Sequence, residues 1–419
     1  MKKELAMKYN RRIFPIYKGF SWQPLFYYAI IYLFLTDVKG ISPSKVMYAE
    51  SFYALFLILL QTPSTIIIEK IGSKRSVVIG TIFATIQITM MIFINSYVLL
   101  ITAYFMSAFG NALKYTARNT LLYDSTIICK GKNSFANINA KGSSLFYILN
   151  AISGITTGYL YVINPYLPLV FSSIVSCLAT IIACRFEEVK INAKQKITME
   201  ESIRDLKQGF LFIIKSKRLR ALFLFILIFP GFIILSFTYE EYLLMELNVS
   251  PQYFGIFFGL LGLVQGFSVL FQDKIHKKFK NKSLAFISIL FFVFFIMIGT
   301  VVRLKMDFII TIIIIICILI LLYSIKGPYW ILEDRYITNF TNSKNRAKIL
   351  SANNIIEYMG QMLVGFVVGL LLEFYEMSKV YIIIGIGGLV VAFIVLAYMK
   401  NRVGLKAEEY DKSDLQYEE

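Results

Sequence analysis

The stretch IIIEKIGSKRSVVIG, residues 66–80, places four charged side chains and a glycine between two long apolar segments. The charges belong to Glu69, Lys70, Lys74 and Arg75, and Gly72 lies among them. The apolar residues on both sides form long blocks without the alternation of a half-buried strand. We therefore expect a short charged turn that joins two helices in an apolar medium.

The composition of the whole chain indicates an all-α membrane protein. Of its 419 residues, 57% are hydrophobic and 16% are charged, and the mean hydropathy is +0.66. A typical soluble protein has about 25% charged residues. Because a backbone in lipid must satisfy its own hydrogen bonds, the apolar blocks are expected to be helices that span the bilayer.

Twelve apolar blocks are long enough, or nearly so, to cross a membrane as helices. A polar insert at 186–218 divides them into two groups of six, so we expect two six-helix bundles at 1–185 and 219–402, followed by a disordered acidic tail at 403–419. The blocks are 20–38, 45–68, 76–94, 97–127, 135–162, 166–185, 219–244, 252–272, 283–302, 308–336, 350–372 and 378–400.

The net charge of +17 is confined to short loops between these blocks, which favours a membrane protein over a partner of nucleic acids. With the N-terminus inside, alternate loops carry basic clusters such as Lys70, Lys74 and Arg75. Few cations fall in the opposite loops. This asymmetry predicts a multi-pass protein of the plasma membrane with both termini in the cytoplasm.

The polar insert contains a predicted surface helix. Thr198 and Glu201 have the spacing of a capping box. The residues that follow have an amphipathic pattern, which predicts a helix along the cytoplasmic face of the membrane. Its apolar residues are Ile203, Leu206, Phe210, Phe212 and Ile213.

Weak similarities between the halves predict an internal duplication in parallel orientation. Ile71 aligns with Phe279 at an offset of 208, since 279 − 71 = 208. Lys114 aligns with Lys326 at 212 and Gly142 with Ser351 at 209. Two such halves suit a transporter with a site near the middle of the bilayer.

The stretch at 65–75 resembles the G-x-x-x-D-[RK]-x-G-[RK]-[RK] motif of the major facilitator superfamily. Glu69 stands in the acidic position, and Lys70, Gly72 and Lys74 match, while Thr65 and Ser73 depart from the motif. LLYDS at 121–125 and RAKILSANN at 346–354 are similar to bacterial efflux-type members. Phe105 occupies the position of the arginine that drug–proton antiporters carry in span 4. The resemblance implies a secondary transporter that works by alternating access.

Ionisable side chains inside spans are candidates for substrate binding or coupling, because each is costly to bury in a membrane. Lys114 and Arg118 lie four residues apart and therefore share a helix face. One hypothesis is that Lys114 and Arg118 form a cationic wall of the substrate cavity. The structural alternative is that backbone carbonyls or an acidic side chain satisfy them. The other candidates of this kind are Lys326, Glu357 and Glu50.

A second set of residues is expected to form a cytoplasmic gate around the quoted stretch. The resemblance implies that Asp124 faces Lys74 and Arg75. Glu333 and Asp334 hold the corresponding place in the second half and are expected to pair with lysines of loop 8–9. By contrast, we expect Glu240 and Glu241 to be solvated, or to extend to the membrane interface, near the outer end of span 7.

The sequence favours proton-coupled export of a small amphiphilic or anionic compound by a monomer. Uptake of a nutrient or anion by the same fold is the first alternative. A membrane-embedded enzyme or a non-transporting receptor is less favoured, since His276 is the one histidine and lies in a basic loop. We expect no metal, cofactor or nucleotide, because the cysteines lack metal spacing and no G-x-x-x-x-G-K-[ST] motif occurs.

Overall fold

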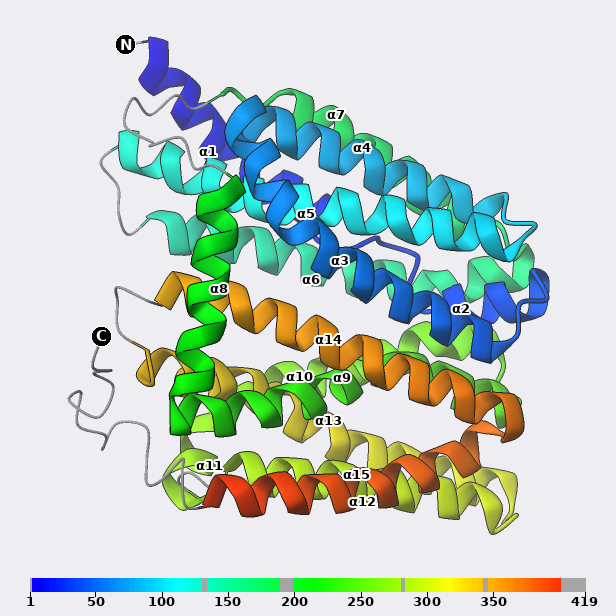
Figure 1. Cartoon of the computed structure of the whole chain (residues 1–419). Helices are drawn as coiled ribbons and strands as arrows, with labels where there is room; N and C mark the ends of the chain where they lie inside the picture. Colours follow the sequence, from blue (N-terminus) through cyan, green and yellow to red (C-terminus); the bar gives the residue numbers. More distant parts are fainter. Residues whose placement is uncertain (1, 130–133, 189–198, 280–282, 342–345, 401–419) are drawn as a thin grey trace. The chain divides into compact units, whose positions relative to one another are not determined.

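The computed structural model describes residues 2–129, 134–188, 199–279, 283–341 and 346–400, and within these ranges all regular structure is helical (Figure 1). Thr198 and the expected acidic tail lie outside the described residues. The chain forms two compact units. The first unit contains residues 1–202 and 250–256, and the second contains 203–249 and the chain from 257 onward. The division falls inside α8, Met199–Lys215.

The first unit is built around α5, the helix that carries Lys114, Arg118 and Asp124. Helices α1 and α3 pack against α5, and α4 packs between α5 and α7. α1 also packs against α6 and α7. The elements are α1 Lys2–Ser21, α2 Ile31–Leu33, η1 Phe34–Val38, α3 Pro43–Ile71, α4 Ser73–Ile92, α5 Tyr97–Ile128, α6 Ser134–Ile163, α7 Leu167–Cys184 and η2 Pro251–Tyr253.

The second unit repeats this pattern of neighbours. Helix α9 packs against α14 and α15, as α1 packs against α6 and α7, and α12 packs against α13 and α15, as α4 packs against α5 and α7. Its elements are α9 Lys217–Glu246, α10 Phe254–Ser268, η3 Val269–Phe271, α11 Gln272–Phe279, α12 Ser283–Arg303, α13 Phe308–Asn339, α14 Arg346–Phe374 and α15 Met377–Lys400; α10 begins within the residues of the first unit.

Helix boundaries recur at the offset that the sequence comparison predicted. Helices α5 and α13 are both 32 residues long, and they start 308 − 97 = 211 residues apart. The spans Pro43–Ile71 and Pro251–Phe279 are both 29 residues long, 251 − 43 = 208 residues apart. Equal lengths at nearly equal offsets support a duplicated six-helix plan.

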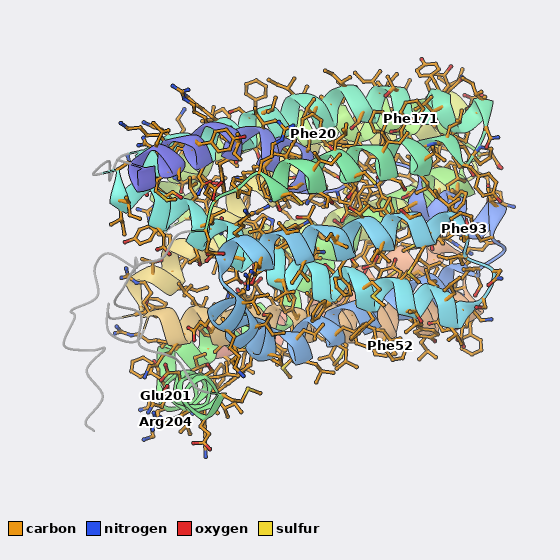
Figure 2. All side chains as sticks on the ribbon, turned by 90° about the horizontal axis from the view of Figure 1, so that it is seen from above. Phe20, Phe52, Phe93, Phe171, Glu201 and Arg204 are labelled. Carbon is orange, nitrogen blue, oxygen red and sulfur yellow. The ribbon has the colours of Figure 1, made fainter. Side chains whose placement is uncertain are left out.

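Ten helices among the described residues are long and apolar enough to cross a membrane. The two other expected spans are α5, which carries three buried charges, and the block at 20–38. Exposed apolar side chains such as Phe93 and Phe171 suit helices that face lipid (Figure 2). The all-α membrane fold is thus confirmed, and the count of twelve is approximately consistent with the structure.

The expected single helix over 20–38 is wrong. Helix α1 ends at Ser21, residues 22–30 form bends and turns, and the π-helix η1 ends the segment. Pro24 is the physical reason, because proline disfavours helical geometry in the residue before it and donates no backbone hydrogen bond. Phe26 takes a positive φ of 59° within this break.

The amphipathic helix in the polar insert is present as α8, and its second half is fixed to α14. Lys348 of α14 lies 2.9 Å from the Asp205 carboxylate and donates a 2.5 Å hydrogen bond to Gln208. A Cβ added at Gly209 would lie 2.5 Å from the Lys348 carbonyl oxygen. This part of α8 therefore packs on protein.

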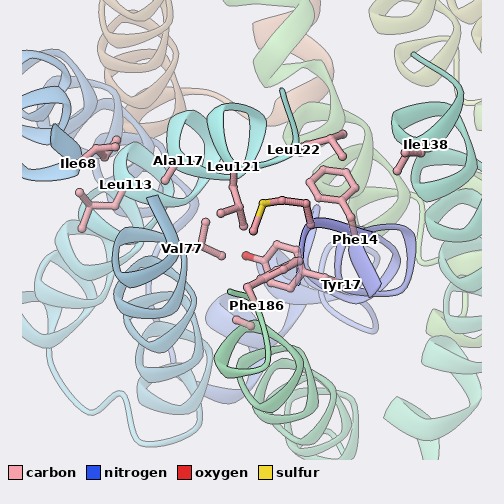
Figure 3. Packing of buried hydrophobic residues seen from close by; sticks show 12 residues of the cluster. Phe14, Tyr17, Ile68, Val77, Leu113, Ala117, Leu121, Leu122, Ile138 and Phe186 are labelled. Carbon is pink, nitrogen blue, oxygen red and sulfur yellow. The ribbon is translucent and has the colours of Figure 1, made fainter. Parts of the chain in front are cut away.

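A cluster of buried side chains packs at one end of the first unit, where α1, α4, α5 and α7 meet (Figure 3). Phe186, which follows α7, is fully buried there and stacks edge-on against Tyr17 at 5.2 Å. Asn10 of α1 bonds both the Glu187 carbonyl and its N–H, at 2.9 and 2.8 Å. The chain after α7 is thereby fixed across α1.

Candidate functional site

Lys114 and Arg118 lie on α5 inside the first unit, with exposed fractions of 3% and 6%. Close approach of α4 to α5 positions them. A Cβ added at Gly80 would lie 2.7 Å from the Gly110 carbonyl oxygen and 2.8 Å from the Lys114 nitrogen. Two glycines facing each other let the helices touch at this level, so Lys114 is held against α4.

These two cations have few partners. The Lys114 ammonium donates one hydrogen bond, of 3.0 Å, to the Ser21 carbonyl oxygen. The Nε and Nη1 atoms of Arg118 are buried without a hydrogen-bond partner. Both cations lie near the ring of Tyr115, at 5.1 and 4.6 Å from its centroid. Within the described part of the chain, no carboxylate forms an ion pair with either residue.

Lys18 of α1 is a third buried cation, which the sequence reasoning missed because it treated the basic N-terminus as a flanking segment. Its ammonium is satisfied by Asn139 Oδ1 at 2.6 Å, Ser143 Oγ at 2.7 Å and the Asn139 carbonyl at 3.2 Å. It also lies 4.3 Å from the centroid of the Trp22 ring. The three donors of Lys18 are thus already used, unlike those of Arg118.

Glu50 of α3 lies half-buried between two tyrosines. The hydroxyls of Tyr32 and Tyr104 each donate a 2.8 Å hydrogen bond to its Oε1 atom. Nearby, Gln87 donates to the Tyr27 hydroxyl at 3.0 Å. These polar contacts bring the broken segment before η1 together with α3, α4 and α5.

Lys326 of α13 is paired, in contrast to Lys114. Its ammonium lies 2.6 Å from Glu240 Oε1, and Tyr323 donates a 2.5 Å hydrogen bond to Glu240 Oε2. Glu240 and Glu241 are fully buried, so the prediction that they are solvated is wrong. The cause is position within the helix, since α9 extends to Glu246 and turns Glu240 toward α13.

Glu333 is buried at 3% exposure. Its expected pairing with lysines of loop 8–9, of which Lys280 and Lys282 lie outside the described residues, stays a prediction. The Glu333 carboxyl interacts electrostatically with that of Glu357 of α14. Asn353 donates a hydrogen bond to Glu357. Asp334 is exposed and pairs with no described lysine, while its neighbour Arg335 pairs with Asp273 at 3.0 Å.

The charged turn between α3 and α4 is closed by an acid that the sequence reasoning missed. Gly72 has φ 93°, and the Glu188 carboxylate accepts hydrogen bonds from the backbone N–H groups of Ser73 and Lys74, each at 3.0 Å. An acid here satisfies the free N–H groups at the start of α4. The preceding run of apolar residues gave no signal for Glu188.

The other residues expected at the cytoplasmic gate differ in their exposure to solvent. Glu69, Lys70 and Arg75 are exposed, whereas Asp124 is buried at 5% within α5. The expected contact of Asp124 with Lys74 and Arg75 stays a prediction.

Comparison with known families places the chain in a class. A family model described as Major Facilitator Superfamily matches residues 20–325 of the 419, so the chain belongs to the major facilitator superfamily. The charged turn and the two similar helical halves agree with this membership. No curated protein matches the sequence.

Solved structures of transporters share the fold. A point mutant of the nucleoside transporter NupG is 12% identical, with a TM-score of 0.74 over 94% of this chain and 99% of that one. The D-xylose-proton symporter is 10% identical, with a TM-score of 0.69 over 94% and 98%. A POT family transporter in complex with 5-aminolevulinic acid is 13% identical, with a TM-score of 0.65 over 94% and 96%. The chain is therefore a secondary transporter of the membrane and not an enzyme.

Proposed function

We propose that this transporter carries a small organic anion and binds it at Lys114 and Arg118. The observation that carries the proposal is the buried Arg118 guanidinium, whose Nε and Nη1 have no partner. Burying a polar group without a hydrogen bond costs about 1–3 kcal/mol, and more when the group is charged. An anionic substrate supplies the missing acceptors and the missing charge.

The chemistry of the two donors defines the class of substrate. A guanidinium presents two parallel N–H groups that match a carboxylate or a phosphate. Lys114 has donors left after its bond to Ser21. The ring of Tyr115, in contact with both cations, offers a flat apolar surface beside them. These features favour a carboxylate or phosphate ester with a small apolar or planar part.

We further propose export coupled to protons, by a monomer in the plasma membrane whose two termini are cytoplasmic. The efflux-type sequence features at 121–125 and 346–354 support export. The buried Glu333 carboxyl and Glu357 support coupling, because two carboxyls that interact electrostatically away from solvent can carry a proton between them. Arg118 and this pair would then serve different steps of one cycle.

Uptake of a neutral or anionic nutrient is the second candidate. The fold shared with the D-xylose-proton symporter and the nucleoside transporter NupG favours it. Transport assays in vesicles of opposite orientation separate the two directions. Accumulation confined to right-side-out vesicles would overturn export and leave the anion site standing.

Thermal unfolding of the purified protein with paired ligands tests the site. Each pair consists of a carboxylate or phosphate ester and its neutral amide or alcohol. We expect the best anion to raise the unfolding temperature of the wild type and of Lys45→Gln, an exposed control, but not of Arg118→Gln. Equal stabilisation by neutral analogues, or full stabilisation of Arg118→Gln, would refute the anion site.

A further inference from the structure

An apolar groove of about 690 Å³ lies in the second unit, between α10, η3 and α11 on one side and α13 on the other. Its walls include Phe257, Leu261, Phe267 and Ile320. Two serines also line it, but Ser268 donates to Gln265 O at 2.7 Å and Ser324 to Leu321 O at 2.6 Å. Both hydroxyl donors are satisfied within their own helices. The groove therefore suits a purely apolar chain.

The groove exists because α10 and α13 meet closely at one level and diverge elsewhere. A Cβ added at Gly327 of α13 would lie 2.5 Å from the Gln265 carbonyl oxygen, so the helices touch there. Beside this contact, Phe267 and Leu263 of α10 are 66% and 59% exposed, and Ile320 of α13 is 40% exposed. Large exposed apolar side chains on membrane helices face lipid.

The length of the groove fits an acyl chain. Its lining on the α10–α11 side extends from Phe257 to Ile275, which corresponds to about 27 Å at 1.5 Å per helical residue. One leaflet of a bilayer has a hydrocarbon depth of about 15 Å, half of the full core. The groove is therefore long enough to hold the whole length of an acyl chain from one leaflet.

A basic surface adjoins one end of the groove. Phe271, Lys274, Ile275 and Lys278 follow the i, i+3, i+4, i+7 spacing of one helix face. Phe271 and Ile275 line the groove, while Lys274 and Lys278 are exposed. The Lys274 ammonium lies 5.2 Å from the centroid of the Phe271 ring. In the described part of the chain, neither lysine forms an ion pair.

We propose that this surface binds an anionic phospholipid, with one acyl chain in the groove and the phosphate at Lys274 and Lys278. The arrangement matches an amphiphile in both parts, since an apolar channel without free donors leads directly to two cations. Basic clusters beside a membrane helix on the cytoplasmic side attract anionic headgroups. The site shares no residue with the one proposed at Lys114 and Arg118 and does not depend on the transported compound.

Lipid titration followed by native mass spectrometry tests the proposal on the full-length protein. Phosphatidylglycerol and phosphatidylcholine with identical acyl chains are compared, because they differ in headgroup charge. Lys274→Gln/Lys278→Gln removes the basic surface. Lys277→Gln/Lys305→Gln removes two other exposed lysines and serves as the matched control. Leu263→Trp fills the groove from its exposed side.

We expect wild type and the control pair to bind phosphatidylglycerol at least tenfold more tightly than phosphatidylcholine. Lys274→Gln/Lys278→Gln should reduce phosphatidylglycerol binding to the phosphatidylcholine level, and Leu263→Trp should weaken both lipids. Equal binding of the two lipids by wild type would overturn the proposal. So would equal losses in the control pair, or displacement of phosphatidylglycerol by millimolar inorganic phosphate, which would indicate a phosphate site without a lipid chain.

Discussion

Two lysines at related positions of the halves have opposite surroundings. Lys326 is neutralised by Glu240, whereas Lys114 and Arg118 have no carboxylate among the described residues. A buried ion pair that loses one partner is strongly destabilised, because the other charge stays buried. A cation kept unpaired in the same environment is instead a feature of a binding site, and it lowers stability until a ligand arrives.

This contrast predicts opposite effects of two matched substitutions on the ligand-free protein. Lys326→Met leaves the Glu240 carboxylate buried and unpaired, so the free energy of unfolding should fall by about 3–5 kcal/mol. Arg118→Met removes unpaired donors, so the free energy of unfolding should rise by about 1–3 kcal/mol. Unfolding in sodium dodecyl sulfate measures both. A loss for Arg118→Met comparable to that for Lys326→Met would mean that Arg118 is structural.

An exposed ion pair offers a reference for these values. Asp273 and Arg335 lie 3.0 Å apart with side chains 62% and 29% exposed. Pairs of this kind contribute about 0–1 kcal/mol. Asp273→Asn should therefore change the free energy of unfolding by no more than about 1 kcal/mol in the same assay. A larger loss would show that the assay does not separate buried from exposed pairs in this protein.

The sequence predicted which residues share a helix face but not which acid meets which base. Lys114 and Arg118 were predicted as a pair because helical spacing is local. Glu240 was interpreted as an interfacial acid, since its partner Lys326 is 86 residues away. Glu188 was missed for the same reason, since its partners Ser73 and Lys74 are 115 and 114 residues away. Contacts between helices depend on helix packing, which a single sequence does not specify.

At the scale of the element, the turn between α3 and α4 depends on Gly72. Its φ of 93° disfavours any side chain, and a Cβ there would lie 2.7 Å from the Glu188 carboxylate. Glu188 in turn closes the start of α4 through the N–H groups of Ser73 and Lys74. The charged turn and the segment after α7 are thus one structural unit.

Gly72→Ala should therefore expose the first turn of α4. We expect faster amide hydrogen exchange at Ser73 and Lys74, with a loss of stability of about 1–3 kcal/mol from the strained backbone. Gly40→Ala is the matched control, because Gly40 has φ 65° but nothing within 4 Å of an added Cβ. If the amides of Ser73 and Lys74 exchange hydrogen at the same rate in both variants, displacement of Glu188 does not cause the exposure of α4.

Apolar blocks predicted most helices because a membrane helix needs an uninterrupted apolar run. The prediction was wrong at residues 22–30, where the apolar run continues through Pro24 and the helix does not. Hydropathy cannot detect this break. Only the proline, with its missing N–H, signalled it.

For the whole molecule, the distribution of basic loops predicts the orientation in the membrane. Single cysteines at Lys45 and Lys305 should react with an impermeant maleimide in intact cells, whereas cysteines at Lys70 and Lys277 should react only after permeabilisation. The background should lack the four native cysteines, of which Cys177, Cys184 and Cys317 are exposed. Labelling of position 70 in intact cells would reverse the predicted orientation.

The measurement that tests the central claim most directly is counterflow in proteoliposomes. The anion that most stabilises the wild type is loaded inside, and entry of the same labelled anion is followed for wild type, Lys114→Gln, Arg118→Gln and Lys45→Gln. We predict exchange by wild type and Lys45→Gln, and at least a tenfold loss for Arg118→Gln and Lys114→Gln. Wild-type exchange by both Lys114→Gln and Arg118→Gln would contradict the claim that these two cations bind the transported anion.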